Sequence, residues 1–153
     1  MTKLQKAVND LEKKLEAYFT NKLPALPVSI KELIVEWLWV LVLVSLIWMG
    51  VSFLMMMGTM LGWGMVMPIG LIMGFGVVWL GGGVILAGMV AGIVLLWKAL
   101  PLLKARKIKG WRFLFYALLI SIGVDLVILN LLGVVINGGI GLYILFQIKE
   151  YYK

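Results

Sequence analysis

Residues 37–97 read WLWVLVLVSLIWMGVSFLMMMGTMLGWGMVMPIGLIMGFGVVWLGGGVILAGMVAGIVLLW and contain no charged side chain; Glu36 precedes the stretch and Lys98 follows it. A membrane-spanning helix needs about 20 mostly apolar residues to cross roughly 30 Å of hydrocarbon. The stretch is too long for one such helix and has the length of two. It therefore predicts an integral membrane protein.

The composition agrees with this prediction. Hydrophobic residues make up 63% of the chain and the mean hydropathy is +1.09, whereas soluble domains use about 45–50% apolar residues. The length of 153 residues suits one compact bundle without a separate enzyme domain. The chain has no cysteine and no histidine, which removes disulfides, thiolate nucleophiles, cysteine metal ligands and the commonest general base. We expect no enzyme, no catalytic residue and no cofactor.

Residues 2–21 are predicted to form an amphipathic helix. Apolar side chains recur there at steps of three and four residues, at Leu4, Val8, Leu11, Leu15, Tyr18 and Phe19. Pro24 and Pro27 then end the helix. We expect residues 1–27 to be a cytoplasmic helix with a proline linker, and residues 28–153 to be the transmembrane domain. The helix is either a membrane-surface or partner-binding element, or a solvated helix packed on its own bundle.

The charge-free stretch is predicted to cross the membrane twice, at about residues 30–57 and 69–97. The breaker residues Gly58, Gly62, Gly64 and Pro68 between them indicate an apolar outer hairpin at residues 58–68. The triple glycine at residues 81–83 either kinks or breaks the second helix, and the sequence leaves both open. A third crossing with its turn at this triple glycine would leave only residues 84–97, fewer than the roughly 17 that a span needs.

A basic loop follows at residues 98–112, and we expect Pro101 to interrupt any helix through it. Loops rich in Lys and Arg stay on the cytoplasmic side of a membrane, where they meet anionic lipid headgroups. The same distribution of charge makes nucleic acid an improbable partner, although the net charge is +7. The expected headgroup-binding residues are Lys104, Arg106, Lys107, Lys109 and Arg112.

The second apolar run, residues 113–146, is also too long for one crossing, and Asn130 is its expected break. The predicted crossings are 111–129 and 131–147, because a break at residues 137–139 would leave too little chain for the return. An even number of crossings in each run places the basic N-terminal segment, the basic loop and the C-terminal lysines on one side. The predicted fold is an all-α, integral membrane four-helix bundle in the bacterial inner membrane, with both termini cytoplasmic.

Asp125 is the one charged residue within the two apolar runs, residues 37–97 and 113–146. An intramembrane carboxylate is by default a functional candidate, because burying its charge is costly. Ser121, Asn130 and Asn137 are its expected hydrogen-bond partners. Asp125 serves either a proton or cation pathway or, as its place near a helix end favours, a local structural role.

Methionine and glycine gather in the middle of the chain. Met56 and Met60 lie one helical turn apart, and thioethers can bind Cu(I), but without His or Cys a filling role for methionine is favoured. Three glycine pairs with GxxxG spacing let helices approach closely in lipid. We expect them to pack the bundle, with homo-oligomer formation as the minority alternative: Gly58 and Gly62, Gly70 and Gly74, Gly88 and Gly92.

Three motifs carry a resemblance to known proteins: LPALP at 23–27, KGWRFLFY at 109–116 and IGLYILFQIKEYY at 140–152. With them the chain resembles small four-helix bacterial membrane proteins of unknown function. The Met- and Gly-rich middle lies outside this resemblance, which leaves room for a designed or generated variant. The sequence therefore predicts a non-enzymatic membrane protein with a structural or interaction role. The alternative is a small transporter or channel subunit that uses Asp125 or the methionines.

Overall fold

The computed structural model describes residues 3–66 and 72–153, without the side chains of residues 4, 5, 21, 60–66 and 72–81. Within this part every element is helical, which confirms the predicted all-α class. The elements are α1 (Lys3–Asn21), α2 (Val28–Val66), α3 (Ile72–Lys104), α4 (Ile108–Val127), α5 (Leu131–Gly133), the π-helix η2 (Val134–Gly141), α6 (Leu142–Gln147) and the 3-10 turn η3 (Lys149–Tyr151).

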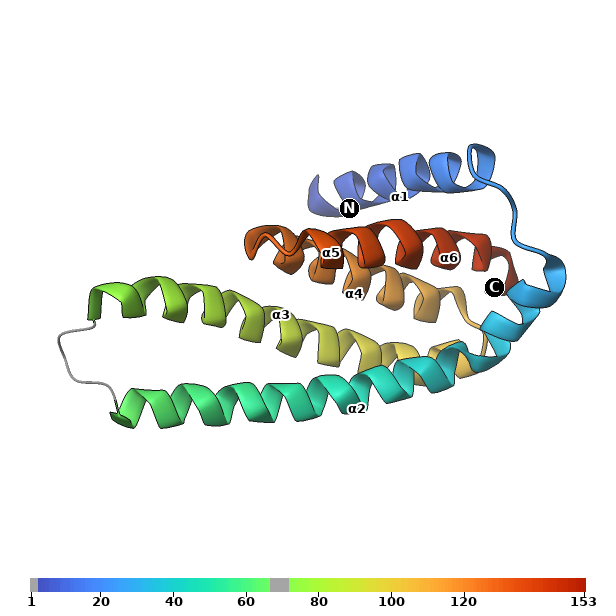
Figure 1. Cartoon of the computed structure of the whole chain (residues 1–153). Coiled ribbons are helices and arrows are strands. Elements are labelled where there is room, and N and C mark those ends of the chain that lie inside the picture. Colours follow the sequence, from blue (N-terminus) through green and yellow to red (C-terminus); the bar gives the residue numbers. More distant parts are fainter. Residues whose placement is uncertain (1–2, 67–71) are drawn as a thin grey trace.

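Among the described residues, three helices are long and apolar enough to cross a membrane, which indicates a membrane protein. They cover Val28–Thr59, Gly82–Lys104 and Ile108–Val127. The segments α5, η2 and α6 follow one another as a shorter apolar helix, Leu131–Gln147. The helices lie side by side in the order α2, α3, α4, α5–α6 and α1, and the α2–α3 pair extends well beyond the α4–α5 turn (Figure 1).

The most tightly packed part of the core lies at the end of the bundle that carries the C-terminus. Trp111 and Phe115 are fully buried, and their stacked rings lie 5.6 Å apart. Phe146 packs against Trp111 at 5.4 Å and Phe19 stacks on Phe146 at 5.8 Å, so α1, α4 and α6 share one aromatic cluster. Burial of these large apolar side chains is what joins α1 to the other helices.

The long surface of α2 is exposed and apolar. Its exposed side chains include Leu33, Trp37, Leu41, Val44, Trp48 and Leu54. A contiguous apolar surface of this length is unusual for a protein in water. It is the surface that the hydrocarbon of a bilayer would cover.

Helices α3 and α4 end in the same way. The residue two positions after each helix has a positive φ, 52° at Arg106 and 57° at Leu129. The next backbone N–H then bonds back to a carbonyl of the last turn, from Lys107 to Leu102 at 2.8 Å and from Asn130 to Asp125 at 2.8 Å. This Schellman geometry usually takes glycine. Here the hydrogen bonds hold ordinary residues in the left-handed region, at a cost of about 1–2 kcal/mol each.

One expectation for the first apolar run is wrong, and one of its two open alternatives is excluded. Helix α2 passes through Gly58 to Val66, so no hairpin begins at Gly58; residues 67–71, with Pro68 and Gly70, lie outside the described part. Helix α3 runs continuously through residues 81–83, so the triple glycine does not break it. Glycine lowers helix propensity by only about 1 kcal/mol per residue, and neighbouring helical residues outweigh that cost.

Pro101 was expected to interrupt the helix but lies inside α3. Ala99 and Leu103, two positions before and after the proline, are almost fully buried. Helix α3 makes its most extensive contacts with α4. Packing therefore holds the last turn helical around the proline, and α3 ends three residues later at Lys104. The break expected at Asn130 is where α5 begins, and the alternative break at residues 137–139 lies within the π-helix.

Candidate functional site

A polar cluster around Asp125 lies where α4 turns back into α5. Asp125 is only 8% exposed. One of its carboxylate oxygens accepts a hydrogen bond from Asn130 Nδ2 at 2.9 Å, and the other accepts one from Asn137 Nδ2 at 2.8 Å. Asn130 Oδ1 in turn accepts the backbone N–H of Gly133 at 3.1 Å and so caps α5.

The local sequence explains this arrangement. Asn130 and Asn137 are seven residues apart, a spacing that puts both on one face of a helix. Gly133 lies between them, and a Cβ there would collide with the Asn130 amide and the Asp125 carboxylate. Only glycine lets the two helices approach closely enough for these bonds. The π-helix η2 then carries Asn137 opposite Asp125, and π-helical turns are frequent at functional sites.

An open cavity of about 120 Å³ adjoins this cluster. Ser121, Asp125 and Asn137 form its polar wall, and Met49 and Met89 lie on the apolar side. The cavity thus lies between α2, α3, α4 and η2. Ser121, the third partner expected for Asp125, lines this wall, but the hydrogen bonds given to the carboxylate in the described part of the chain come from Asn130 and Asn137.

The depth of Asp125 follows from its level along α3. Its neighbour Val124 lies directly against Gly88 of α3. Gly88 precedes Lys98, the first charged residue of the basic loop, by about 15 Å of helix. That is half of a hydrocarbon layer roughly 30 Å thick. A bilayer that begins at Lys98 would therefore place Asp125 near its middle, where a charged side chain costs about 2.5–3.5 kcal/mol on insertion scales.

The tip of the α4–α5 turn is apolar apart from Asn130, which is exposed. The exposed apolar side chains around it are Leu126, Val127, Ile128, Leu129, Leu131 and Leu132. Backbone groups within hydrocarbon must find partners inside the protein. The bonds from Asn130 to Asp125 and from Gly133 to Asn130 provide such partners, so the cluster can close a turn within the apolar layer.

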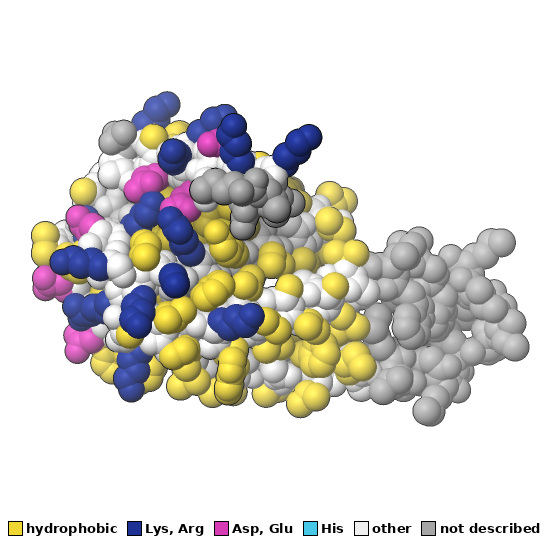
Figure 2. All heavy atoms as spheres, turned by 180° about the vertical axis from the view of Figure 1, so that it is seen from behind, with side chains coloured by type: hydrophobic (Ala, Val, Ile, Leu, Met, Phe, Trp, Pro, Cys, Tyr) yellow, Lys and Arg dark blue, Asp and Glu magenta, His cyan; other side chains and the backbone are white. Residues whose placement is uncertain are grey.

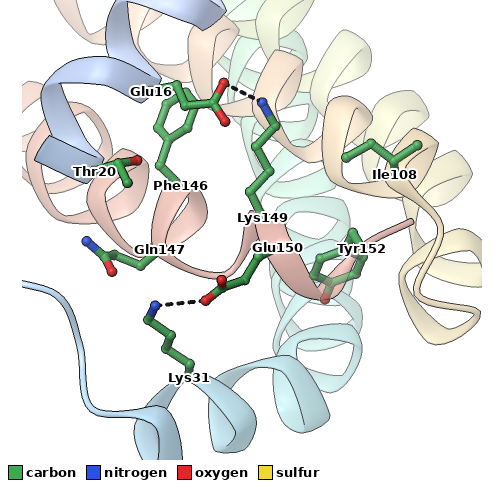
Figure 3. A pocket seen from close by; sticks show the side chains of 9 residues that line it. All are labelled: Glu16, Thr20, Lys31, Ile108, Phe146, Gln147, Lys149, Glu150 and Tyr152. Atoms are coloured by element: carbon green, nitrogen blue, oxygen red, sulfur yellow. Dashed lines mark hydrogen bonds and ion pairs between the residues drawn. The ribbon is translucent and has the colours of Figure 1, made fainter.

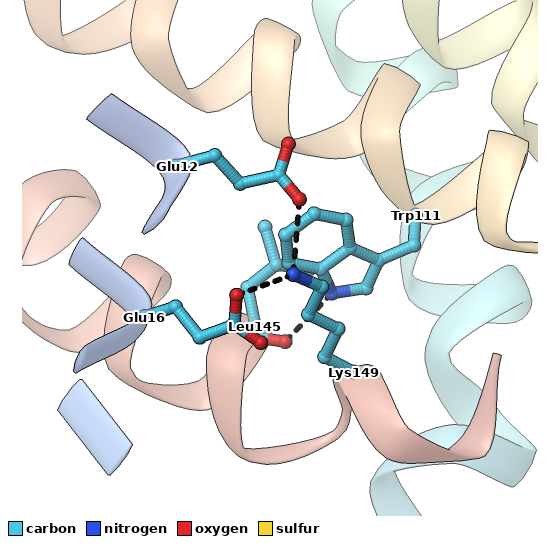
Figure 4. Close-up of polar contacts among 5 residues, drawn as sticks. All are labelled: Glu12, Glu16, Trp111, Leu145 and Lys149. Carbon is cyan, nitrogen blue, oxygen red and sulfur yellow. Dashed lines mark hydrogen bonds and ion pairs between the residues drawn. The ribbon is translucent and has the colours of Figure 1, made fainter. Parts of the chain in front are cut away.

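A second cluster, formed by Glu12, Glu16, Lys149 and Trp111, joins α1 to the C-terminus (Figure 4). Lys149 Nζ donates to Glu12 at 2.9 Å and to Glu16 at 2.7 Å, and it lies 4.9 Å from the centre of the Trp111 ring. Trp111 Nε1 donates to the Leu145 carbonyl at 2.8 Å. We call this cluster the Lys149 clamp.

The pKa of Lys149 reflects opposing effects. Burial by itself lowers it, but the hydrogen bonds and charges of Glu16 and Glu12 outweigh burial, so the pKa lies above the ordinary 10.5. The charged lysine therefore stabilises the folded state. That contribution is complete below pH 10.5 and is lost as the pH rises through the higher pKa of the folded state.

An open pocket of about 360 Å³ lies beside the clamp, between α1, the start of α2 and the C-terminus (Figure 3). Lys31 pairs with Glu150 across it at 2.9 Å. Gln147 ties in the linker, because its Nε2 donates to the Phe19 carbonyl at 3.3 Å and its Oε1 accepts the Leu26 N–H at 3.4 Å. Burial raises the pKa of Tyr152 to about 12, against a smaller lowering by Arg106.

Replacing Lys149 with methionine is expected to loosen α1. Glu12 is 6% exposed and would lose its charged partner, so we expect the unfolding free energy to fall by about 1–2 kcal/mol, a value reduced for the partial exposure of Glu16. Protease cleavage in the linker at residues 22–27 should become faster. Lys13→Met, at an exposed position of α1, is the control. Equal cleavage rates in the two variants would contradict the role of the clamp.

The other predicted residues are scattered. The five basic residues expected to bind headgroups are exposed, but the loop is shorter than expected, because Lys104 ends α3 while Lys109 and Arg112 lie in α4. Lys104 lies 5.2 Å over the Trp39 ring. Met56 is half-buried on α2, while the side chain of Met60 lies outside the description, so Cu(I) binding stays a prediction.

The glycine pairs also differ from one another. Gly88 packs against Val124 and Gly92 faces Met49, whereas the space around Gly58 is open. The surroundings of Gly62 and Gly74 lie outside the description, as does Gly70. Only the Gly88–Gly92 pair is therefore seen between helices of the described bundle.

Sequence reasoning missed the Lys149 clamp and the hydrogen bonds of Gln147 to Phe19 and Leu26. Glu12 and Glu16 are one turn apart on α1, and this spacing was the available signal for an inward acidic pair. Nothing in the sequence indicated that Lys149 faces them. No model of a known protein family matches the chain, and neither a curated protein nor a solved structure matches it. The resemblance to small bacterial membrane proteins stays a prediction.

Proposed function

We propose that the protein is a non-enzymatic integral membrane protein with a structural or interaction role, which holds a charged end at the cytoplasmic face of the bacterial inner membrane. The observation that carries this proposal is the separation of charge along the molecule. Charged side chains gather over one end, while the neighbouring surface is mostly apolar (Figure 2). Among the charged residues, Asp125 alone falls within residues 37–97 or 113–148.

The proposed topology has four membrane-embedded helices in two hairpins. The α3–α4 loop, the N-terminal segment and the C-terminus all carry Lys or Arg, and the positive-inside rule puts such segments on the cytoplasmic side. Both termini are then cytoplasmic. The hairpin of α4 with α5–α6 is the shorter of the two, so the α2–α3 hairpin alone reaches deep into the far leaflet.

The proposed partners are lipids and other membrane helices. The exposed basic loop fits anionic headgroups, since each Lys or Arg near an anionic surface contributes about 1 kcal/mol. The apolar surface of α2, with open space around Gly50 and Gly58, fits lipid chains. A homo-oligomer through this surface is the further possibility within the same role.

Neutralising the basic loop is expected to reduce the binding of anionic lipid several-fold. The variant replaces Lys104, Arg106, Lys107, Lys109 and Arg112 with glutamine. The matched control replaces Lys3, Lys6, Lys13, Lys14 and Lys22 with glutamine as well. It removes the same number of positive charges, but from α1 and the residue after it. Mass spectrometry of the lipids retained in mixed phosphatidylglycerol and phosphatidylcholine nanodiscs measures the effect. Equal losses in both variants would contradict a lipid-binding loop.

Transport is the competing function, and the cavity at Asp125 is the observation that favours it. Liposomes containing the purified protein would separate the two functions. The structural role predicts no protein-dependent flux of protons, monovalent cations or Cu(I). A flux that disappears in Asp125→Asn, or in the double variant Met56→Leu and Met60→Leu, would overturn the proposed function.

A further inference from the structure

The cavity beside Asp125 combines a buried carboxylate with other oxygen atoms. Asp125 and Ser121 contribute from α4, and Asn137 contributes from η2. Since Nδ2 of Asn137 donates to Asp125, the side-chain carbonyl of Asn137 is left to accept. The volume of about 120 Å³ is several times the roughly 30 Å³ that one water molecule occupies in the liquid. The site is therefore polar and roomy enough for an ion with part of its hydration shell.

The charge of Asp125 is not balanced by a protein cation in the described part of the chain. The ion pairs there are Lys31–Glu150, Lys149–Glu12 and Lys149–Glu16, and Asp125 belongs to none of them. Two amide N–H groups donate to the carboxylate, but a neutral amide supplies no compensating charge. A charged group at this depth in a membrane calls for an opposite charge.

We propose that this cavity binds one monovalent metal cation of the Na⁺ class at the Asp125 carboxylate, with Ser121 and Asn137 as further oxygen donors. Carboxylate, hydroxyl and carbonyl oxygens suit hard cations. A single positive charge neutralises the single carboxylate, whereas a divalent cation would leave an uncompensated charge in the apolar layer. The cation is a resident part of the fold, so the inference holds whether the protein is a scaffold or a transporter.

The test uses the full-length protein purified in mild detergent. A cation that binds only the folded state raises the melting temperature in a saturable way. We expect a rise of a few degrees when NaCl replaces choline chloride at constant ionic strength and alkaline pH. Asp125→Asn should abolish the rise. Ser121→Ala should increase the Na⁺ concentration at half-saturation several-fold, and Ser52→Ala, which lies outside this cavity in the neighbouring groove of α2, should leave it unchanged.

Three results would overturn the proposal. The first is an identical melting temperature of the wild type in the two salts, and the second is a Na⁺ response that persists in Asp125→Asn. The third is a rise of the melting temperature on acidification in choline chloride that is as large as the Na⁺ effect, because the compensating charge would then be a proton. If Asp125→Asn does not fold, binding of ²²Na⁺ to the wild type, Ser121→Ala and Ser52→Ala decides. Weaker binding in Ser121→Ala alone supports the site, and equal binding in all three overturns it.

Discussion

Replacing Trp111 with alanine is expected to lower the unfolding free energy by about 3–5 kcal/mol, the usual cost of truncating a buried aromatic side chain. Trp111 is fully buried and touches the three parts of the chain that meet at the charged end. It stacks on Phe115, donates to the Leu145 carbonyl at 2.8 Å and lies under the Lys149 ammonium. The substitution removes all of these contacts and leaves a cavity between α4 and α6.

The measurement is SDS-induced unfolding in mixed micelles, followed by circular dichroism because the substitution removes an indole. Trp48→Ala is the control, since Trp48 is 74% exposed on α2. We expect this control to stay within about 0.5 kcal/mol of the wild type, as for other surface substitutions. A loss of similar size in the two variants would show that Trp111 does not anchor the core.

Replacing Gly110 with alanine is expected to lower the unfolding free energy by about 2–3 kcal/mol, the upper part of the range for overpacking. A Cβ at Gly110 would lie 2.8 Å from the carbonyl carbon of Leu102 and 2.8 Å from the backbone nitrogen of Leu103. Backbone atoms cannot turn aside as a flexible side chain can. The first turn of α4 would have to move away from the last turn of α3.

Gly123→Ala on the same helix is the matched control. Nothing lies within 4 Å of a Cβ at Gly123, so alanine should raise the unfolding free energy there by up to about 1 kcal/mol through its higher helix propensity. The two variants make the same chemical change, but the unfolding free energy is expected to fall in Gly110→Ala and to rise in Gly123→Ala. The same SDS titration measures both, and a stabilised Gly110→Ala would disprove the close approach of α3 and α4.

Chemical patterns along the chain were sufficient for the helical class and for the turn at Asn130. A charge-free stretch can be solvated only by hydrocarbon or by a large core, and an asparagine between two apolar segments supplies a local polar partner for the backbone of a turn. Local patterns were less reliable at Gly58 and at Pro101. Each carries a residue that weakens helices, but the cost of one such residue is smaller than the gain from extending a packed or fully hydrogen-bonded helix.

At the candidate site, too, some residues were expected from the sequence and other features were not. Asn130 and Asn137 were expected partners of Asp125, because they are polar side chains in the same apolar run as the carboxylate. The cavity was not predictable, since Met49, Met89 and Ser121 come from three helices whose registers are set by packing. The Lys149 clamp was also missed, because it depends on α1 folding back across the C-terminal turn.

The sequence by itself determined that this protein is helical and apolar over most of its length, with every charge except that of Asp125 in the segments outside two apolar runs. Those properties are local, because the free energy of transferring a side chain from water to an apolar environment depends mainly on that side chain. Only the tertiary structure decided that α4 ends beside the middle of α3, that two amides from one helix meet the carboxylate of another, and that Trp111 lies at the centre of the core. These depend on how helices approach one another, and contacts such as Gly88 with Val124 or Gly110 with Leu102 set that distance only once the chain has folded.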